Sequence, residues 1–235
     1  MKCKIRFLKF FLSFSEMKRK HSETDFDKKY WPKPSFAQRI NGTGDLKPFL
    51  SFHTHRILKP YIRQDYESEP LKLKLLREIQ SKKDPNVPKY HINYTYIQPK
   101  HVLQINRIAC EFFWPGIDVS ECLKYPDFSC VVSYKELIIG FAFLVPDYSH
   151  TEAYISYIFT HPEWRRHGIA KFMVYHLIQT CMGKDIVLHV SASNPAAFLY
   201  LKFGFKIEEI INNFYEHYQQ NQEDSKHALF LRLSR

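Results

Sequence analysis

The chain has 235 residues, of which 45% are hydrophobic and 16% aromatic, with only 7 Gly and 13 Pro. This length and composition predict one well-buried domain with extensions and argue against a low-complexity chain. The five cysteines are odd in number and no two are spaced as C-x-x-C. This pattern argues against a disulfide framework or a cysteine zinc site, and it indicates a reducing compartment.

The net charge of +10 is concentrated in the first part of the chain. Residues 1–90 carry 21 Lys and Arg against 10 Asp and Glu, a net of +11, whereas residues 91–235 carry 13 against 14, a net of −1. A basic segment beside a near-neutral domain favours an acidic partner, such as nucleic acid, chromatin or an acidic protein face. The alternative is a solvated, mobile segment without a partner.

Residues 1–48 mix charges with three prolines and show no sustained hydrophobic periodicity, so they predict a basic, poorly ordered arm. A short apolar run at 7–14 is interrupted by Lys9, and no small-residue cleavage site follows it. We therefore expect neither a signal peptide nor a membrane span. Residues 17–21, MKRKH, have the composition of a nuclear import signal, although such short basic runs are common.

Residues 49–91 are expected to form an extension that precedes the main domain. Four apolar residues between 71 and 79 recur at helical spacing and predict a short helix over 70–81. Pro85 and Pro88 then end the helical pattern.

The pattern changes in residues 92–235, which we expect to form the main domain. Strands are predicted at 93–99, 128–134, 137–146, 152–160, 185–191, 205–211 and 227–233. Helices are predicted at 101–113, 168–182 and 194–203, the last with Asn194 as its N-cap and Pro195 at its first position, and 114–126 is predicted as a turn followed by a short helix. This order predicts an α/β (α+β) fold with one mixed central sheet of about seven strands flanked by helices.

The stretch 161–177, HPEWRRHGIAKFMVYHL, places cations and small residues directly before an apolar helical pattern. Gly168 and Ala170 allow the backbone to turn tightly and to bring its N–H groups close to a ligand. The following helix adds the positive end of its dipole. The side chains that add positive charge here are Arg165, Arg166, His167 and Lys171. Together these features predict a phosphate or pyrophosphate site.

The alternative for this stretch is a plain strand-to-helix turn with exposed arginines. A dinucleotide-binding fold is disfavoured, because no G-x-G-x-x-G is present and a hairpin precedes the turn. A P-loop is disfavoured because no G-K-[ST] follows the glycine.

Three motifs in this sequence resemble one family. Residues 165–170, RRHGIA, match the R/Q-x-x-G-x-G/A loop of the GNAT acetyltransferases, and residues 158–165, IFTHPEWR, look like the strand and loop before it. Residues 194–205, NPAAFLYLKFGF, are similar to the later family helix with its Tyr-x-x-x-Gly-Phe ending. The resemblance covers about 92–235. From residue 51 onward, with stretches such as HTHRILKPYIRQDYE, the chain also resembles the GNAT subunit of the ATAC (Ada-two-A-containing) chromatin complex.

The resemblance implies a GNAT fold, acetyl-CoA as co-substrate and no metal. The loop 165–170 would hold the pyrophosphate, and the strand edge at 158–160 would pair with the pantetheine amides as an added strand does. A backbone N–H on that edge would stabilise the thioester oxygen. The implied coenzyme-binding residues are Ile158, Phe159, Thr160, Arg165, Arg166, His167, Gly168, Ile169, Ala170, Lys171 and Asn194. Asn194 stands one residue closer to Tyr200 than the usual family Asn, and Ser193 holds the usual place.

The resemblance also implies catalytic roles. Tyr200 matches the general acid of the family, four residues before Gly204, although a tyrosine there can also be core packing. The position of the family's general base is Tyr154, which is a poor base. Glu152 lies two residues away on the same strand face and is a candidate base, or else a carboxylate at the rim of the strand. Tyr215 and Tyr218 either flank a substrate lysine or pack on the sheet.

The resemblance therefore implies a lysine N-acetyltransferase that acts on histones or other chromatin proteins within a coactivator complex in the nucleus. The alternative is an acetyl-CoA-binding scaffold subunit with little catalysis, which the missing glutamate at position 154 favours. A third hypothesis is direct nucleic-acid binding by the basic arm, but regularly interleaved aromatic residues are not found. No membrane partner is expected.

Overall fold

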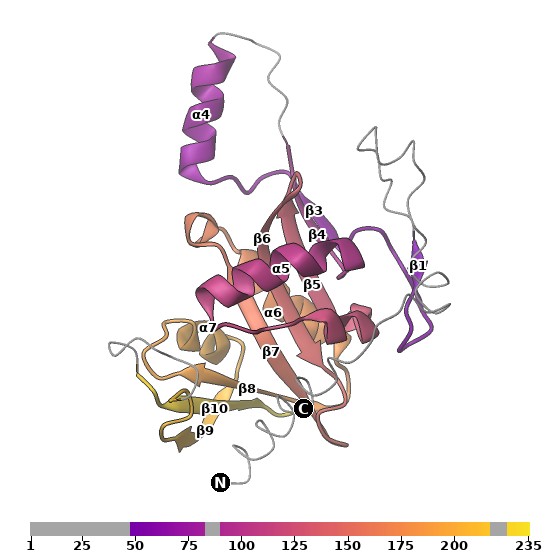
Figure 1. Cartoon of the computed structure of the whole chain (residues 1–235), viewed down its shortest axis with the longest axis vertical. Coiled ribbons are helices and arrows are strands. Elements are labelled where there is room, and N and C mark those ends of the chain that lie inside the picture. The colour runs from indigo at the N-terminus through magenta and orange to yellow at the C-terminus, as the bar shows by residue number, and fades with distance from the viewer. Residues whose placement is uncertain (1–47, 83–89, 217–224) are drawn as a thin grey trace.

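The computed structural model describes residues 48–82, 90–216 and 225–235 (Figure 1). The arm predicted over 1–48 lies outside the described residues except for Pro48, and Tyr218 also lies outside them. None of the helices in the described ranges combines the length and the apolar character that a membrane span requires.

The described residues form an eight-stranded mixed sheet flanked by helices, which confirms the predicted fold class. The strand order is β3-β4-β5-β6-β7-β8-β10-β9, and every pair is antiparallel except β7 with β8. The strands are β3 Arg63–Asp65, β4 Ile92–Thr95, β5 Ser129–Tyr134, β6 Leu137–Val145, β7 Glu152–Thr160, β8 Asp185–Ser191, β9 Lys206–Ile211 and β10 Ala228–Leu233. A separate two-stranded sheet consists of β1 Phe49–Leu50 and β2 Ile57–Leu58.

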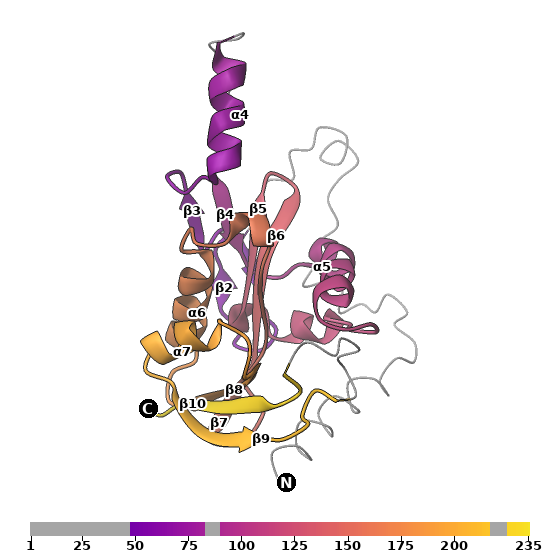
Figure 2. The ribbon, with the colours of Figure 1, turned by 90° about the vertical axis from the view of Figure 1, so that its left-hand side faces the viewer.

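Helices cover both faces of the large sheet (Figure 2). The described helices are α4 Leu71–Ser81, α5 Pro99–Phe112, α6 Ile169–Thr180 and α7 Ala197–Lys202, with 3-10 turns η1 Ser120–Lys124, η2 Pro126–Phe128 and η3 Pro162–Trp164. Helix α4 does not cover the sheet but projects beyond β3. On one face, α6 buries Met173 and Leu177 in a cluster with residues of β5 to β8. On the other face, α5 buries Ile105 and Ala109 against β6 and β7. The sheet is thus enclosed in two apolar layers.

Gly140 lies on β6 below the first turns of α6 and beside β7. A Cβ built on this residue would lie 3.0 Å from the carbonyl oxygen of Phe159 of β7, which is too close, and at the ordinary contact distances of 3.5 and 3.6 Å from Ile169 and Met173 of α6. A side chain here would therefore crowd the backbone of β7, the strand that precedes the predicted anion loop.

Residues of the predicted extension join the same sheet. β3 pairs antiparallel with β4, from Arg63 opposite Tyr94 to Asp65 opposite Ile92. The hydroxyl group of Thr54 donates to the buried carboxylate of Asp127 over 2.7 Å. The eighth strand therefore comes from the extension, and the predicted boundary at residue 91 lies between two paired strands.

The helix predicted over 194–203 begins later than expected. The residue at the N-cap is Ala196, and α7 runs from Ala197 to Lys202. Asn194 accepts a hydrogen bond from the N–H of Ala196 through its Oδ1 at 2.9 Å. This is a local turn closed by the asparagine side chain, so Asn194 and Pro195 precede the helix. The prediction of Asn194 as the N-cap is therefore wrong by two residues.

The two central strands β7 and β8 separate after three residue pairs. They pair in parallel only at Glu152, Ala153 and Tyr154 of β7, opposite residues 185–187 of β8. Beyond Tyr154, β7 stays paired with β6 through a β-bulge, whereas β8 stays paired with β10 as far as Ser191. The two strands then diverge, as Figures 1 and 2 show. From residue 155 onward the β8 side of the β7 backbone has no strand partner among the described residues.

Candidate active site

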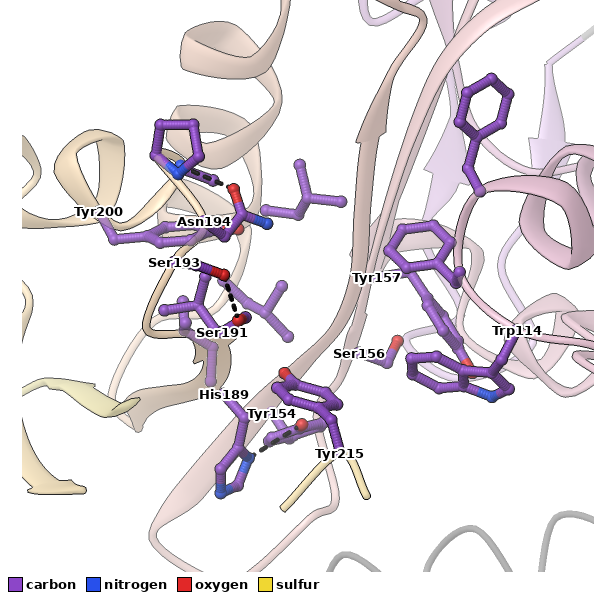
Figure 3. A pocket seen from close by; sticks show the side chains of 18 residues that line it. Trp114, Tyr154, Ser156, Tyr157, His189, Ser191, Ser193, Asn194, Tyr200 and Tyr215 are labelled. Atoms are coloured by element: carbon purple, nitrogen blue, oxygen red, sulfur yellow. Dashed lines mark hydrogen bonds between the residues drawn. The ribbon is translucent and has the colours of Figure 1, made fainter. Parts of the chain in front are cut away.

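A pocket of about 350 Å³ lies where β7 and β8 diverge. Its walls are residues 154–158 of β7, residues 188–191 of β8 and the turn at 193–196. The remaining lining residues are aromatic, namely Phe112, Phe113, Trp114, Tyr200 and Tyr215. In Figure 3, Tyr200 and Asn194 lie on one side of the pocket, and Tyr157 and Trp114 lie on the other.

The loop between η3 and α6 has the backbone that the sequence predicts. Arg166 has a φ of 67° and Gly168 a φ of 78°, so two residues adopt the left-handed region. A Cβ built on Gly168 meets no atom within 4 Å, so the space beside this glycine is open. The loop is anchored by the Nε of Arg165, which donates to the carbonyl oxygen of Thr160 over 3.3 Å.

The N–H groups of this loop are available to a ligand. The first helical N–H to find a partner is that of Phe172, which donates to the carbonyl oxygen of Gly168 over 3.0 Å. Within the described part of the chain, no acceptor takes the N–H groups of residues 166–171. Unpaired N–H groups at the start of a helix bind anions.

The predicted cations lie on the same loop and in the first turn of α6. Arg165, Arg166 and Lys171 are exposed and form no ion pair with another described residue. His167 is half-buried, and its Nδ1 lies 2.7 Å from the carbonyl oxygen of Arg165. Residues 165–171 do not line the pocket, so the loop and the pocket are two separate parts of the candidate site.

The three predicted residues of the strand edge differ in position. Ile158 lines the pocket, whereas Phe159 and Thr160 do not. The ring of Phe159 packs on the α5 side, 4.8 Å from the ring of Phe112. The hydroxyl group of Thr160 is buried and has no hydrogen-bond partner among the described residues. Phe159 and Thr160 can therefore contribute to the site through their backbone.

Tyr200 lies in the pocket wall with its side chain only 7% exposed. Burial raises the pKa of its hydroxyl above the usual value. The group therefore stays protonated at neutral pH and can donate a hydrogen bond or a proton. Asn194 also lines the pocket and, while its Oδ1 accepts from Ala196, its amide nitrogen is turned toward the pocket (Figure 3).

Tyr154 and His189 form a pair at the end of the pocket where β7 and β8 meet. The hydroxyl of Tyr154 lies 3.0 Å from the Nδ1 of His189 (Figure 3). Burial raises the pKa of Tyr154 well above its usual value and lowers that of His189 to about 3. Both groups are therefore uncharged at neutral pH. In the tautomer that leaves Nδ1 unprotonated, Tyr154 donates to His189.

Glu152 has the position of the alternative, a carboxylate at the rim of the strand, and not that of a general base in the pocket. Glu152 lies where β7 and β8 are still paired, and it does not line the pocket. Its Oε1 accepts from the Nη2 of Arg232 over 2.8 Å, and the same guanidinium binds Asp185 and Glu208. Glu152 and Tyr154 do lie on the same face of β7, as predicted. However, Arg232 of β10 binds the Glu152 carboxylate at the end where β7 and β8 are still paired.

Several lining residues were not predicted. His189 comes from β8 and meets Tyr154 only because the parallel pairing places residues 154 and 187 side by side. Trp114 and Tyr157 pack 6.3 Å apart and line the opposite wall. The spacing of histidines along the chain carries no signal for His189, because its partner is 35 residues away. Within residues 48–82, 90–216 and 225–235, no three His, Cys, Asp or Glu side chains gather closely enough to hold a metal ion.

Acidification is expected to destabilise the fold through buried histidines. Burial lowers the pKa of His101 and His189 to about 3 and that of His176 to about 4. Below about pH 6.5 these histidines become protonated in the unfolded chain but stay neutral in the folded chain. The free energy of unfolding therefore decreases as the pH is lowered. Each histidine should contribute about 1.4 kcal/mol per pH unit between pH 6 and its folded pKa. Urea denaturation at pH 7, 6 and 5 measures how the free energy of unfolding depends on pH. His189→Asn should reduce this dependence by the share of one histidine, about 1.4 kcal/mol per pH unit. Equal stability at all three pH values would contradict the prediction.

Comparison with known proteins places this geometry in a family context. The model of the acetyltransferase (GNAT) family matches residues 83–205, which is 123 of the 235 residues. Cysteine-rich protein 2-binding protein of Homo sapiens and that of Mus musculus are each 56% identical to the chain over 210 residues. The match covers 85% of this chain but 27% of each relative, so the chain spans about a quarter of their length.

Two solved structures share the fold. Arabidopsis thaliana Naa50, in complex with the bisubstrate analogue CoA-Ac-MVNAL, superposes with a TM-score of 0.51 and 21% identity over 61% of this chain and 99% of that chain. The NatC complex bound to Gag peptide and CoA gives a TM-score of 0.53 and 20% identity over 61% and 98%. At these identities the likeness confirms the fold alone.

Proposed function

The chain belongs to the acetyltransferase (GNAT) family, and we propose that it transfers an acetyl group from acetyl-CoA to lysine side chains of histones or other chromatin proteins. The observation that carries the acetyl-CoA part of the proposal is the divergence of β7 and β8 beyond Tyr154, which leaves one side of β7 unpaired beside an aromatic pocket. A strand edge of this kind binds an extended ligand with amide groups as an added strand. The lysine acceptor rests on the resemblance to the GNAT subunit of the ATAC complex.

The residues present fit acetyl-CoA. The N–H groups of residues 166–171 and the start of α6 would hold the pyrophosphate, and the exposed Arg166 and Lys171 would add charge beside it. The unpaired side of β7 would hold the pantetheine amides at residues 158–160. The thioester, which supplies the acetyl group, would then lie in the pocket near Tyr200.

The pocket residues can move the two protons of the reaction. The amine attacks the thioester carbon, so that a C–N bond forms and the C–S bond breaks. Tyr154 can accept the proton of the amine while it passes its own proton to the Nδ1 of His189. Tyr200 can donate its proton to the departing thiolate, because its buried hydroxyl is protonated at neutral pH.

A transfer assay with matched peptides tests the acceptor. One histone-tail peptide carries a single lysine and an acetylated N-terminus, and the other has a free N-terminus and norleucine in place of the lysine. With the full chain and labelled acetyl-CoA, we expect label on the lysine peptide only. Label only on the second peptide would show an α-amine acceptor instead, and would contradict the lysine proposal without contradicting the enzyme class.

The Tyr154–His189 pair gives a second prediction. His189→Asn should lower kcat about 10²-fold at pH 7.5, because the relay loses its final proton acceptor. The loss should shrink as the pH approaches 10, where lysine amines arrive unprotonated. Tyr154→Phe should have the same effect, and the double variant should be no worse than either single one, because the two residues act as a unit. If the decrease in kcat were the same at every pH, the Tyr154–His189 pair would have a structural role and not a role in proton transfer.

The second candidate is an acetyl-CoA-binding scaffold subunit with little catalysis. Two observations favour it, namely that no carboxylate lines the described part of the pocket and that burial makes a protonated His189 costly. In that case acetyl-CoA would raise the melting temperature, yet no acetylated product would appear with either peptide.

We also propose that the protein works in the nucleus as a subunit of a coactivator complex. The resemblance to the GNAT subunit of the ATAC complex supports this, and so does the name of the matched relatives, which denotes binding to another protein. Nucleic-acid binding by the basic arm remains the third hypothesis. Deletion of residues 1–47 should abolish such binding, and binding by the intact chain should weaken steeply with salt.

A further inference from the structure

Helix α4 presents an apolar face that no described part of the chain covers. None of its 11 residues is buried. Leu71 is 68% exposed, Leu75 49%, Leu76 56% and Ile79 58%. In Figures 1 and 2 the helix stands clear of the sheet, beyond β3. Four large apolar side chains on one helix of about three turns are an uncommon exposed patch for a folded chain.

These side chains form one stripe. At 100° per residue, Leu71, Leu75 and Ile79 fall within about 80° of one another, and Leu76 lies about 60° further round. The spacing i, i+4, i+8 is that of helices that pack along their length against another helix or a groove. The stripe is therefore shaped for a partner that lies along α4.

The base of the helix is fixed to the body, so the stripe is held in place. Leu73 packs against the main core cluster. Arg77 forms an ion pair with Glu69 at 2.9 Å, and Lys72 forms one with Glu163 of η3 at 2.8 Å. An isolated helix of this length is only marginally stable in water. These contacts stabilise the helical conformation of α4, and a bound partner would stabilise it further.

The positive charge of α4 indicates which kind of partner can bind along the apolar stripe. Residues 71–82 carry four cations, Lys72, Lys74, Arg77 and Lys82, against one anion, Glu78. Lys74 and Lys82 form no ion pair with another described residue. A second copy of α4 would bring like charges together, and so would residues 1–47, which hold 12 Lys and Arg against 5 Asp and Glu.

We propose that α4 is a docking helix for a partner protein whose own amphipathic helix pairs an apolar stripe with acidic flanks. No residue of α4 lines the pocket, so docking can be measured separately from acetyl transfer. The ion pair between Lys72 and Glu163 places the first turn of α4 beside the turn that leads into the anion loop.

Two synthetic peptides of the same length test the proposal. Both carry the same leucine stripe at helical spacing, but one has Glu and the other Lys on its flanks. Fluorescence anisotropy with the full chain should show binding of the Glu peptide and at least roughly tenfold weaker binding of the Lys peptide. Equal affinity for both peptides would overturn the proposal, and so would a lack of binding by the Glu peptide.

Variants locate the binding to α4. The double variant Leu75→Gln with Ile79→Gln should lose at least roughly tenfold in affinity for the Glu peptide, because the centre of the stripe is removed. Gln keeps good helix propensity. The matched control is Leu103→Gln, an exposed leucine of α5, which should bind as the wild type does. Unchanged binding by the double variant would overturn the proposal.

The competing occupants give different results. A dimer in sedimentation that the double variant abolishes would assign the stripe to a second copy of the chain. Binding to phosphatidylserine vesicles that the double variant abolishes would assign it to a membrane surface. Either result would overturn the proposal. The melting-temperature shift caused by acetyl-CoA should be equal in all variants, which separates a failure here from a failure of the proposed enzyme function.

Discussion

Replacement of Tyr200 with Phe should lower kcat about 10²- to 10⁴-fold and leave the Kd for acetyl-CoA within about twofold of the wild-type value. The ring remains in the pocket wall and keeps its packing against Phe205, 5.9 Å away. Only the hydroxyl that stays protonated through its raised pKa is lost. The thiolate must then leave without a proton donor, so the deficit appears in the chemical step and not in coenzyme binding.

Steady-state kinetics and calorimetry with the same preparation separate the two effects. The control is Tyr175→Phe, because Tyr175 is 51% exposed on α6 and does not line the pocket. That variant should react as the wild type does. A Tyr200→Phe enzyme with an unchanged kcat would remove Tyr200 as the proton donor.

Replacement of Gly168 with Val should weaken acetyl-CoA binding about 100-fold or more, since a β-branched residue resists a φ of 78°. A Cβ at this position meets no atom within 4 Å, so the expected effect comes from the backbone conformation. The φ angle at residue 168 must change. The N–H groups of the following residues would then no longer point toward the same anion. The strain itself should cost about 1–2 kcal/mol of stability.

The structure offers a matched control for this strain. Gly183 follows the other end of α6 with a φ of 83° and equally open surroundings. Gly183→Val should therefore lose similar stability in urea denaturation but keep its affinity for acetyl-CoA. If both variants bound acetyl-CoA equally well, the loop would not be the pyrophosphate site.

The part of the fold that rests on local patterns was predictable. Alternation of apolar residues gave the bounds of the strands at 152–160 and 185–191, and the structure has them as β7 Glu152–Thr160 and β8 Asp185–Ser191. The tight turn of the loop followed from Gly168, because glycine adopts a φ of 78° without steric cost, whereas the φ of 67° at Arg166 was not predicted. The extra strand β3 escaped prediction because three residues, RQD, carry no periodicity.

The part that depends on long-range pairing was not predictable. The divergence of β7 and β8 depends on the other neighbour of each strand. Beyond Tyr154, β7 stays paired with β6, and β8 stays paired with β10. Glu152 and Tyr154 were correctly placed on one strand, but nothing local shows that Arg232, 80 residues away, engages the first of them. His189 was missed for the same reason, because its partner Tyr154 lies 35 residues away on another strand.

Hydrogen–deuterium exchange on the full chain, with and without acetyl-CoA, tests the central claim most directly, because it reads the amide hydrogens themselves. We expect acetyl-CoA to slow exchange at residues 166–171 and along residues 155–160 of β7, with little change in α4 or β9. Unaltered exchange in both segments at saturating acetyl-CoA, or protection elsewhere alone, would contradict the proposal that the diverging strands and this loop bind the coenzyme.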